Sequence, residues 1–260
     1  IKQCLVGSEM CIRDSHLGID PLVVRRRNFY PHKFTPNGGK GRTPYGQLVE
    51  DCVLQDIVGE LAESADYASR RAEIEAFNKA NSVIRRGIAL TPVKFGISFN
   101  TTFLNQAGAL VHVYTDGSVH LNHGGTEMGQ GLNTKVAQVV AHEFQVDFDA
   151  VKITATTTGK VPNTSATAAS SGTDLNGMAA QAAARTIKER MRVHLAEQHQ
   201  CAPDSVTFTN GKVRAGSAVM SFAEAVKSCY FGRISLSATG FYATPKIHWD
   251  KQRSLSLIHI

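Results

Sequence analysis

The stretch GGTEMGQGLNTK, residues 124–135, is the most unusual part of the sequence. It places four glycines within eight residues and mixes them with Glu127, Met128 and Gln130. Glycine at this density loses much conformational entropy on folding, so it is kept where the backbone needs unusual dihedral angles or a close approach. The stretch therefore predicts a specialised loop. The residues after it, 132–145, carry apolar side chains at helical spacing and predict a helix.

The order strand, small-residue loop, helix occurs twice. A hairpin predicted over 108–123, with Asp116-Gly117 at its turn, leads into the glycine-rich loop. A strand predicted over 151–156 leads into a loop of Thr, Ser, Ala, Gly and Asn over 157–173, followed by an alanine-rich helix from 174 to about 197. A helix N-terminus exposes unpaired N–H groups and partial positive charge, so both loops are candidate anion-binding sites.

The remaining patterns are helical before residue 86 and mainly strand-like after it. The other predicted elements are helices over 16–28, 47–64 and 66–79, strands over 87–99 and 233–244, a hairpin at 207–213, and a helix opened by a capping box at Ser221. Hairpins and helices in this order favour mixed layers over a regular parallel sheet. We therefore predict an α+β fold, in which mixed α/β layers contain hairpins and strand–loop–helix units.

The composition excludes several classes of protein. An apolar fraction of 42% with 19% charged residues indicates a folded chain. No apolar run reaches the roughly 18–20 residues of a membrane span, so we expect no membrane partner. The five cysteines form no CxxC pair and favour a cytoplasmic location. A net charge of +6 without a basic stripe and interleaved aromatics argues against nucleic acid as a partner.

Known motifs for nucleotide binding and hydrolysis fail at these loops. Gly159-Lys160 is followed by Val161 and lacks the upstream glycine of a P-loop, and Gly129-Gln130-Gly131 is followed by Thr134 where a dinucleotide motif has glycine. His142-Glu143 has Val146 where a zinc hydrolase has its second histidine. From spacing alone, a connecting role, a non-catalytic module for a phosphorylated ligand and an enzymatic site all remain open.

Two long motifs resemble the molybdenum hydroxylase family. HGGTEMGQGLNTKVAQVVA (123–141) and VPNTSATAASSGTDLNG (161–177) look like the molybdopterin-binding part of its bacterial xanthine dehydrogenase branch. The segments 94–119 and 233–250 carry the same resemblance, which covers about 16–250 in order. The VPNTSATAAS stretch favours the purine-oxidising branch, with a related aldehyde or N-heterocycle hydroxylase as the alternative. The predicted fold is then part of a larger molybdopterin-binding domain.

The resemblance implies roles for residues of both loops and of one upstream segment. Phe99 is expected to pack against a purine ring, and Asn100, where many members carry Thr, to hydrogen-bond the substrate. No catalytic residue and no metal ligand is expected in this chain. Glu127 is expected to order its loop, and His120 and His123 to be surface hairpin residues. The residues expected to line the pterin and its phosphate are Met128, Gly129, Gln130, Gly131, Thr167, Ala168, Ala169, Ser170, Ser171 and Gly172.

The resemblance also implies the setting of the chain. We expect residues 1–15 and 253–260 to be foreign to the protein, 16–85 to be a helical connecting region, and 86–252 an incomplete molybdopterin-binding region. The expected reaction is hydroxylation of xanthine or hypoxanthine at a molybdenum–molybdopterin centre. Electrons would pass to iron–sulfur clusters and FAD on another domain or subunit of a dimeric enzyme. The proton-abstracting glutamate is expected beyond residue 260, so this chain alone is expected to be inactive.

Overall fold

The computed structural model describes residues 12–31, 41, 49, 52–93, 96–154, 156–161, 163–245, 247–250, 252 and 255–257. The expectations for residues 1–11, 253–254 and 258–260 therefore lie outside the described residues. The chain divides into two compact units, Ile1–Phe95 and Gly96–Ile260. Within the described residues, none of the helices has the length and apolar character needed to cross a membrane.

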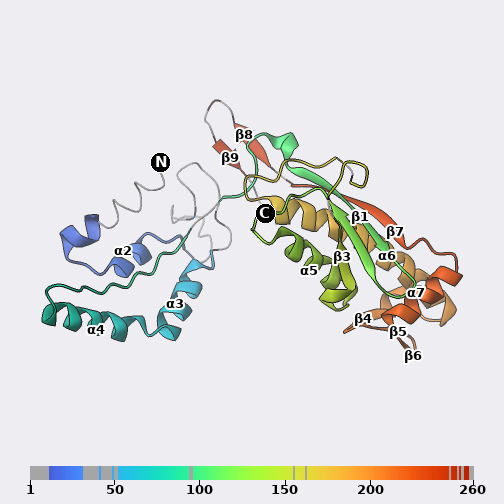
Figure 1. The fold of residues 1–260 in the computed structure, drawn as a ribbon, viewed down its shortest axis with the longest axis horizontal. Helices are drawn as coiled ribbons and strands as arrows, with labels where there is room; N and C mark the ends of the chain where they lie inside the picture. Colours follow the sequence, from blue (N-terminus) through green and yellow to red (C-terminus); the bar gives the residue numbers. More distant parts are fainter. Residues whose placement is uncertain are drawn as a thin grey trace. The chain divides into compact units, whose positions relative to one another are not determined.

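The N-terminal unit is helical, with α2 (Pro21–Arg27), α3 (Leu54–Ser64) and α4 (Tyr67–Ala80) (Figure 1). The helix predicted over 16–28 is observed from Pro21, where the Asp20 carboxylate caps it by accepting a hydrogen bond from the Leu22 N–H at 2.7 Å. α3 begins at Leu54, whereas the apolar spacing predicted a helix from residue 47. Four of the seven residues predicted before Leu54, namely 47, 48, 50 and 51, lie outside the described part of the chain.

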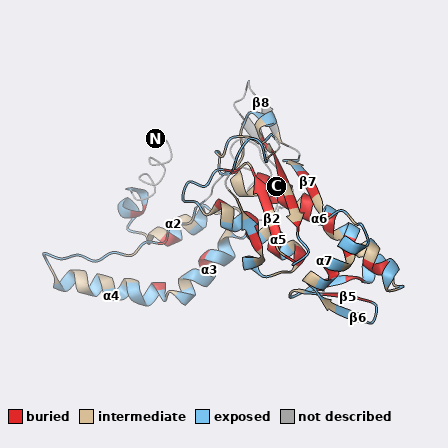
Figure 2. Cartoon of the chain, turned by 45° about the vertical axis from the view of Figure 1, so that its right-hand side comes forward, coloured by how far each residue is buried: buried red, intermediate tan, exposed pale blue. Residues whose placement is uncertain are grey.

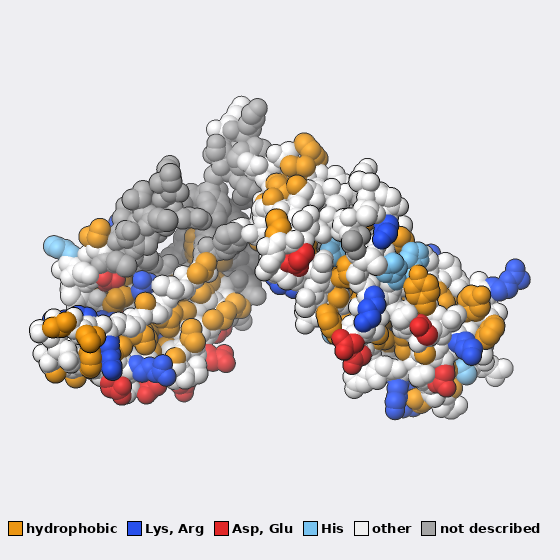
Figure 3. All heavy atoms as spheres, in the orientation of Figure 1, with side chains coloured by type: hydrophobic (Ala, Val, Ile, Leu, Met, Phe, Trp, Pro, Cys, Tyr) orange, Lys and Arg blue, Asp and Glu red, His pale blue; other side chains and the backbone are white. Residues whose placement is uncertain are grey.

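The N-terminal unit has a small core and leaves much apolar surface exposed. Its buried centre contains Leu22, Val58, Tyr67 and Leu90. Ile57 and Leu61 of α3 remain 54% and 49% exposed, and apolar side chains reach the surface of this unit in Figure 3. Figure 2 shows that α3 and α4 are mostly exposed along their lengths. Most of the buried apolar surface of the chain therefore lies in the C-terminal unit.

The strand predicted over 87–99 is wrong for the residues that the structure describes, 87–93 and 96–99. Pro92 has no N–H to donate to a neighbouring strand, which weakens any pairing of this segment. At its end, the backbone of Phe99 is bound by the side chain of Asn105 instead of by another strand. Apolar residues alone do not make a strand, because a strand also requires a paired neighbour.

The C-terminal unit is built on a four-stranded sheet in the order β3-β2-β1-β7 (Figure 1). β1 (Gln106–Val113) and β2 (Val119–His123) form the predicted hairpin. β7 (Ser237–Ala243) pairs antiparallel with the other edge of β1, and β3 (Val151–Ile153) pairs in parallel with β2. A mixed sheet covered by helices confirms the predicted α+β fold.

Two helices follow the two small-residue loops and pack on this sheet. α5 (Leu132–Phe144) lies against α6 and β3, and α6 (Gly172–Gln198) lies against β7 and β1. The inner side of α6 is made of small, fully buried residues, namely Ala179, Ala180, Ala183 and Ala184. Figure 2 shows the buried residues gathered in the sheet and on the helix sides that face it. Each loop thus runs from a strand of this sheet to a helix that packs on it.

A small sheet and a short helix follow α6 in the C-terminal unit. β4 (Thr207–Thr209), β5 (Lys212–Ala215) and β6 (Ala218–Ser221) form a small antiparallel sheet, of which the sequence predicted only the first hairpin. α7 (Phe222–Phe231) begins at the predicted capping box, in which the Ser221 hydroxyl accepts from the Glu224 N–H at 3.2 Å and the Glu224 carboxylate accepts from the Ser221 N–H at 2.7 Å. Near the C-terminus, β8 (His248–Asp250) pairs with β9 (Leu255–Leu257).

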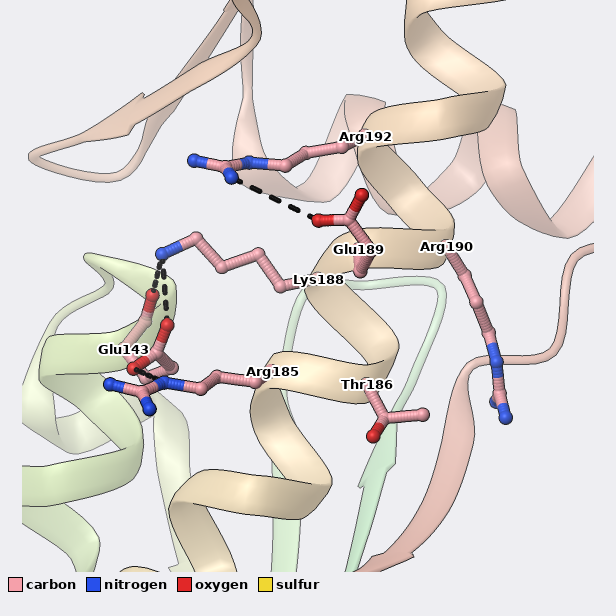
Figure 4. Close-up of a pocket in the computed structure, with 7 residues that line it drawn as sticks. All are labelled: Glu143, Arg185, Thr186, Lys188, Glu189, Arg190 and Arg192. Carbon is pink, nitrogen blue, oxygen red and sulfur yellow. Dashed lines mark hydrogen bonds and ion pairs between the residues drawn. The ribbon is translucent and has the colours of Figure 1, made fainter. Parts of the chain in front are cut away.

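A network of charged groups fastens the end of α5 to the middle of α6 (Figure 4). Lys188 Nζ donates to the Glu143 backbone carbonyl at 2.5 Å and to its carboxylate at 3.2 Å. Arg185 Nε donates to the other Glu143 carboxylate oxygen at 3.2 Å. Burial acts to raise the pKa of Glu143, but the hydrogen bonds and charges of Lys188 and Arg185 outweigh it and lower that pKa. The pocket in Figure 4 is thus lined by cations that already have partners.

Replacing Lys188 by methionine is expected to lower the free energy of unfolding by about 2 kcal/mol, because it leaves the half-buried Glu143 carboxylate short of a partner. Chemical denaturation of the full-length protein measures this change. Glu189→Gln is the matched control, since Glu189 is exposed and its ion pair with Arg192 is long, at 3.9 Å. The pair Glu143→Gln with Lys188→Met should lose less stability than Lys188→Met alone, and an equal or larger loss would contradict the role given to this contact.

Candidate functional site

The glycine-rich loop, residues 124–131, is ordered by the carboxylate of Glu127. Its Oε1 accepts hydrogen bonds from the N–H groups of Gly129 at 2.9 Å and Gly131 at 3.0 Å, and its Oε2 accepts one from Asn133 at 3.1 Å. The backbone N–H groups, Asn133 first, lower the pKa of Glu127. The predicted loop-ordering role is confirmed, and the carboxylate also caps the start of α5, where the N-cap residue Gly131 has no side chain.

The Gln130 side chain also bonds to its own loop. Its Oε1 accepts from the Met128 N–H at 2.6 Å, and its Nε2 donates to the Thr126 carbonyl at 2.8 Å. The amide thus closes a short ring of backbone contacts, while the Met128 side chain stays 67% exposed. A contact from Gln130 to a bound heterocycle remains a prediction.

Glycine is required at the four glycine positions of this loop for two different structural reasons. Gly129 and Gly131 have φ values of 97° and 74°, which only glycine adopts readily. At Gly124, an added Cβ would lie 2.0 Å from the Thr164 Cγ2 atom, and at Gly125 it would lie 2.5 Å from a methyl group of Leu132. Gly129 and Gly131 therefore shape the loop, whereas Gly124 and Gly125 let it pack closely against neighbouring side chains.

The second loop turns sharply over its last residues, 167–172, where α6 begins. Ala169 and Ser170 both lie in the left-handed region, with φ values of 53° and 55°, although neither is glycine. Such residues are uncommon and concentrate at functional sites. Ser171 stands at the N-cap of α6, but its hydroxyl donates to the Ala168 carbonyl at 3.0 Å and makes no capping bond to the helix. The start of α6 is thus without a side-chain cap.

Hydrogen bonds join the two loops and a third segment. The Thr126 N–H donates to the Thr167 hydroxyl oxygen at 2.8 Å, which links the first loop to the second. The Ser98 N–H donates to the Ala169 carbonyl at 2.9 Å, which links the segment carrying Phe99 to the second loop. The residues predicted for cofactor and substrate binding therefore belong to three segments that the fold brings together.

His123 differs from its expected place on the surface, because it is 2% exposed. It is the last residue of β2 and faces the layer between the sheet and the helices, which the hairpin pattern alone did not reveal. Its Nδ1 accepts a hydrogen bond from the Gly125 N–H at 3.1 Å, and burial lowers its pKa. His120, in contrast, is partly exposed, and its Nε2 lies 3.2 Å from the Thr154 hydroxyl.

Buried polar atoms without partners gather around these segments. Asp174 lies in the first turn of α6, where burial raises its pKa against the opposing effect of the Thr244 and Tyr242 side chains. Among the described residues, Arg192 is the only side chain with a buried, unpartnered polar atom that lies far from the loops, toward the C-terminal end of α6. Around the loops, the buried side-chain atoms without a hydrogen-bonding neighbour in the described part of the chain are Ser98 Oγ, Thr164 Oγ1 and Asn176 Oδ1. The half-buried Asp174 carboxylate has the Thr244 hydroxyl as a neighbour, and the buried His123 ring has the Asn133 side chain.

Comparison with known proteins defines the class to which this fold and site belong. Residues 60–256 match the family described as molybdopterin cofactor-binding domain, and the chain belongs to this family. It is 43% identical over 232 residues to xanthine dehydrogenase from Blastobotrys adeninivorans, covering 89% of this chain and 15% of that protein. It is 44% identical over 236 residues to nicotinate hydroxylase from Emericella nidulans, covering 90% of this chain and 16% of that protein.

Solved structures of low sequence identity share the fold. Quinoline 2-oxidoreductase from Pseudomonas putida 86 matches with a TM-score of 0.67 at 22% identity, over 90% of this chain and 31% of that one. A Cu,Mo-CO dehydrogenase matches with a TM-score of 0.71 at 20% identity, over 91% of this chain and 32% of that one. The chain spans about 15% of the length of the curated relatives it matches. The resemblance to molybdenum hydroxylases is thereby confirmed.

The site has the properties that a molybdopterin cofactor requires. A phosphate needs N–H and hydroxyl donors, and the uncapped start of α6 lies beside the hydroxyls of Thr167 and Ser170. Buried polar atoms without partners are rare in proteins, so their concentration here suits a polar ligand. At α5 the Glu127 carboxylate already accepts from the helix-start N–H of Asn133, whereas the Asp174 carboxylate in the first turn of α6 hydrogen-bonds the Thr244 and Tyr242 side chains. The second loop is therefore the better candidate for the phosphate.

Sequence reasoning missed three residues that shape the site. Asn105 hydrogen-bonds the backbone of Phe99, and His123 accepts a hydrogen bond from the backbone of Gly125. The side chain of Asn176 packs so closely on Gly125 that a Cβ there would lie 2.8 Å from its Nδ2. All three are buried polar side chains on or beside elements with apolar patterns. A polar residue inside an otherwise buried strand or helix was the available signal, because such residues are retained where they bond to something.

Proposed function

We propose that this chain is part of the molybdenum subunit of a purine-oxidising hydroxylase that acts on xanthine or hypoxanthine. The hydrogen bond from Thr126 to Thr167 is the observation that carries the proposal, since it joins the two loops into one binding surface. The 43% identity to a xanthine dehydrogenase supports the choice of substrate. In the complete enzyme we expect electrons to pass to iron–sulfur clusters and FAD on other parts, in a dimeric cytoplasmic protein.

Each segment has a proposed role in this function. The hydroxyls of Thr167 and Ser170 bind the phosphate together with the first N–H groups of α6, while Ser171 contributes through its place at the start of that helix. Ala168, Ala169 and Gly172 leave room for the cofactor to approach. Met128, Gly129, Gln130 and Gly131 line the pterin. When bound, the cofactor supplies the redox chemistry, and the protein supplies binding, orientation and electrostatics. Phe99 forms one wall for the purine ring, and Asn100, which is exposed, hydrogen-bonds its edge.

The roles of this chain are limited to binding and orientation. Glu127 is a poor proton acceptor, because its carboxylate already accepts three backbone hydrogen bonds and its pKa is lowered. We propose that the proton-abstracting group is supplied by another part of the complete protein. The present chain by itself should then bind ligands without turning them over.

Substrate profiling of the complete, cofactor-loaded enzyme tests the proposal. We expect kcat/KM for xanthine or hypoxanthine to exceed that for nicotinate and for benzaldehyde by at least about tenfold, because the purine edge offers more hydrogen-bonding groups. The 260-residue chain alone serves as the control and should give no product. Turnover of xanthine by this chain alone would contradict the proposed division of roles.

A nicotinate or other N-heterocycle hydroxylase is the second candidate function. It is favoured by the 44% identity to a nicotinate hydroxylase, which is as high as the identity to xanthine dehydrogenases. Phe99 would serve equally as a wall for a pyridine ring. A preference for nicotinate over xanthine in the same assay would replace the first proposal with this one.

A further inference from the structure

Asn105 is a buried polar residue at the junction between the Phe99 segment and the sheet. It directly precedes β1 and is 1% exposed. Its backbone is fixed on two sides, because its N–H donates to the Thr102 carbonyl at 3.1 Å and its carbonyl accepts from the Thr244 N–H at 3.0 Å. Thr244 directly follows β7. Asn105 is therefore anchored to two adjacent strands of the sheet on which α6 packs.

The side chain of Asn105 binds both backbone groups of Phe99. Its Oδ1 accepts from the Phe99 N–H at 2.8 Å, and its Nδ2 donates to the Phe99 carbonyl at 2.9 Å. The same Nδ2 lies 3.4 Å and 3.3 Å from the carbonyls of Thr101 and Thr102. One amide thus gives Phe99 the donor and acceptor that a neighbouring strand would otherwise provide.

A second anchor holds the preceding residue. Ser98, with a φ of 82°, donates its N–H to the Ala169 carbonyl of the second loop at 2.9 Å. Phe99 consequently lies between one attachment to the sheet, through Asn105, and one to the candidate cofactor loop, through Ser98. Two attachments on consecutive residues restrict the backbone from which the Phe99 ring projects.

We propose that Asn105 is a positioning residue that sets the place of the Phe99 ring and thereby the affinity for an aromatic heterocyclic substrate. This inference rests on the proposed function, in which Phe99 forms a wall of the substrate site. The Phe99 side chain is only half-buried, so packing leaves its position partly free and the backbone contacts restrict it. A residue with a merely structural role would alter stability without altering substrate affinity.

The test uses the complete, cofactor-loaded enzyme and uric acid, an oxidised purine with no ring C–H left to hydroxylate. Calorimetry measures the uric acid Kd, alongside the KM for xanthine, the molybdopterin content and the Tm. Asn105→Ala should raise the Kd and the KM about five- to tenfold, as expected for a misplaced aromatic contact, with unchanged molybdopterin content. Asn105→Ser, which is small and keeps a hydroxyl that can bond one of the Phe99 backbone groups, should give a smaller increase and covers the case in which Asn105→Ala fails to fold.

Two comparisons separate positioning from general destabilisation. Asn122→Ala removes another buried asparagine of the same sheet, whose Oδ1 accepts from the Thr154 hydroxyl, and should lower the Tm without changing the Kd. In a Phe99→Ala background, Asn105→Ala should raise the Kd no further, because its effect acts through the ring.

The outcomes distinguish this inference from the proposed function. An unchanged Kd in Phe99→Ala would refute the proposed substrate wall and the inference with it. A raised Kd in Phe99→Ala but an unchanged Kd in both Asn105 variants would overturn the inference alone. Independent, additive effects of Asn105→Ala and Phe99→Ala would also overturn it.

Discussion

Replacing Gly240 by alanine is expected to lower the free energy of unfolding by about 3 kcal/mol or more, because the added methyl group meets backbone atoms. A Cβ at this position would lie 2.0 Å from the Ala179 carbonyl oxygen and 2.6 Å from the Ala183 nitrogen of α6. Gly240 lies in the middle of β7, an edge strand of the main sheet, opposite Ala109 of β1. The helix has to move away from the sheet, since no side-chain rotation can relieve a contact with backbone.

Thermal and urea unfolding of the full-length protein measure this loss. Gly159→Ala is the matched control, because a Cβ there meets nothing within 4 Å and its φ is not positive. The displaced helix begins at Gly172, in the second loop, so the Gly240→Ala protein should also retain less molybdopterin. A Gly240→Ala protein as stable as the Gly159→Ala protein would show that α6 does not approach β7 this closely.

Replacing Glu127 by glutamine is expected to reduce the molybdopterin content of the purified complete enzyme about tenfold, since charge-assisted hydrogen bonds are lost and an NH2 group faces backbone donors. The carboxylate accepts from Gly129, Gly131 and Asn133, and glutamine offers a single acceptor oxygen in its place. The loop should then populate other conformations in which Met128 and Gln130 no longer hold their positions. Molybdopterin released on denaturation and quantified per subunit gives the readout.

The effect of pH on molybdopterin retention follows from the lowered pKa of Glu127. The backbone N–H groups hold the pKa of Glu127 below its usual value, so the carboxylate stabilises the loop at neutral pH, and this stabilisation is lost as pH falls through the lowered pKa. Wild-type enzyme should therefore release molybdopterin only in acid, whereas Glu127→Gln should release it at neutral pH as well. Glu224→Gln, which alters a similar exposed cap on α7, is the control and should retain its molybdopterin. Full retention by Glu127→Gln would refute the role of this carboxylate.

The local elements were largely predictable, because their signals lie within a few residues. The hairpin turned at Asp116-Gly117, the start of α2 at Pro21 and the capping box at Ser221 each depend on contacts between near neighbours. The strand expected over 87–99 was not predictable in this way, since a strand exists only when another segment pairs with it. The third strand of the small sheet, β6, was missed for the same reason.

The candidate site shows the same division more sharply. The glycine count of residues 124–131 indicated a special loop, but it did not separate Gly124 and Gly125, which make room for protein, from Gly129 and Gly131, which adopt positive φ. The position of His123 at the end of a hairpin suggested exposure, and the packing of α5 and α6 on the sheet buries it.

By itself the sequence determined the family, the order of the elements and the two loops that carry the candidate site, because each is written in a continuous run of residues. Only the tertiary structure decided which groups meet: Thr126 with Thr167, Ser98 with Ala169, and Asn105 with Phe99. The first two contacts join residues about 40 and 70 positions apart in the sequence, and a local sequence pattern does not predict contacts between residues so far apart. Directed hydrogen bonds depend on where packed elements place their ends, and that is set by the whole core of the C-terminal unit.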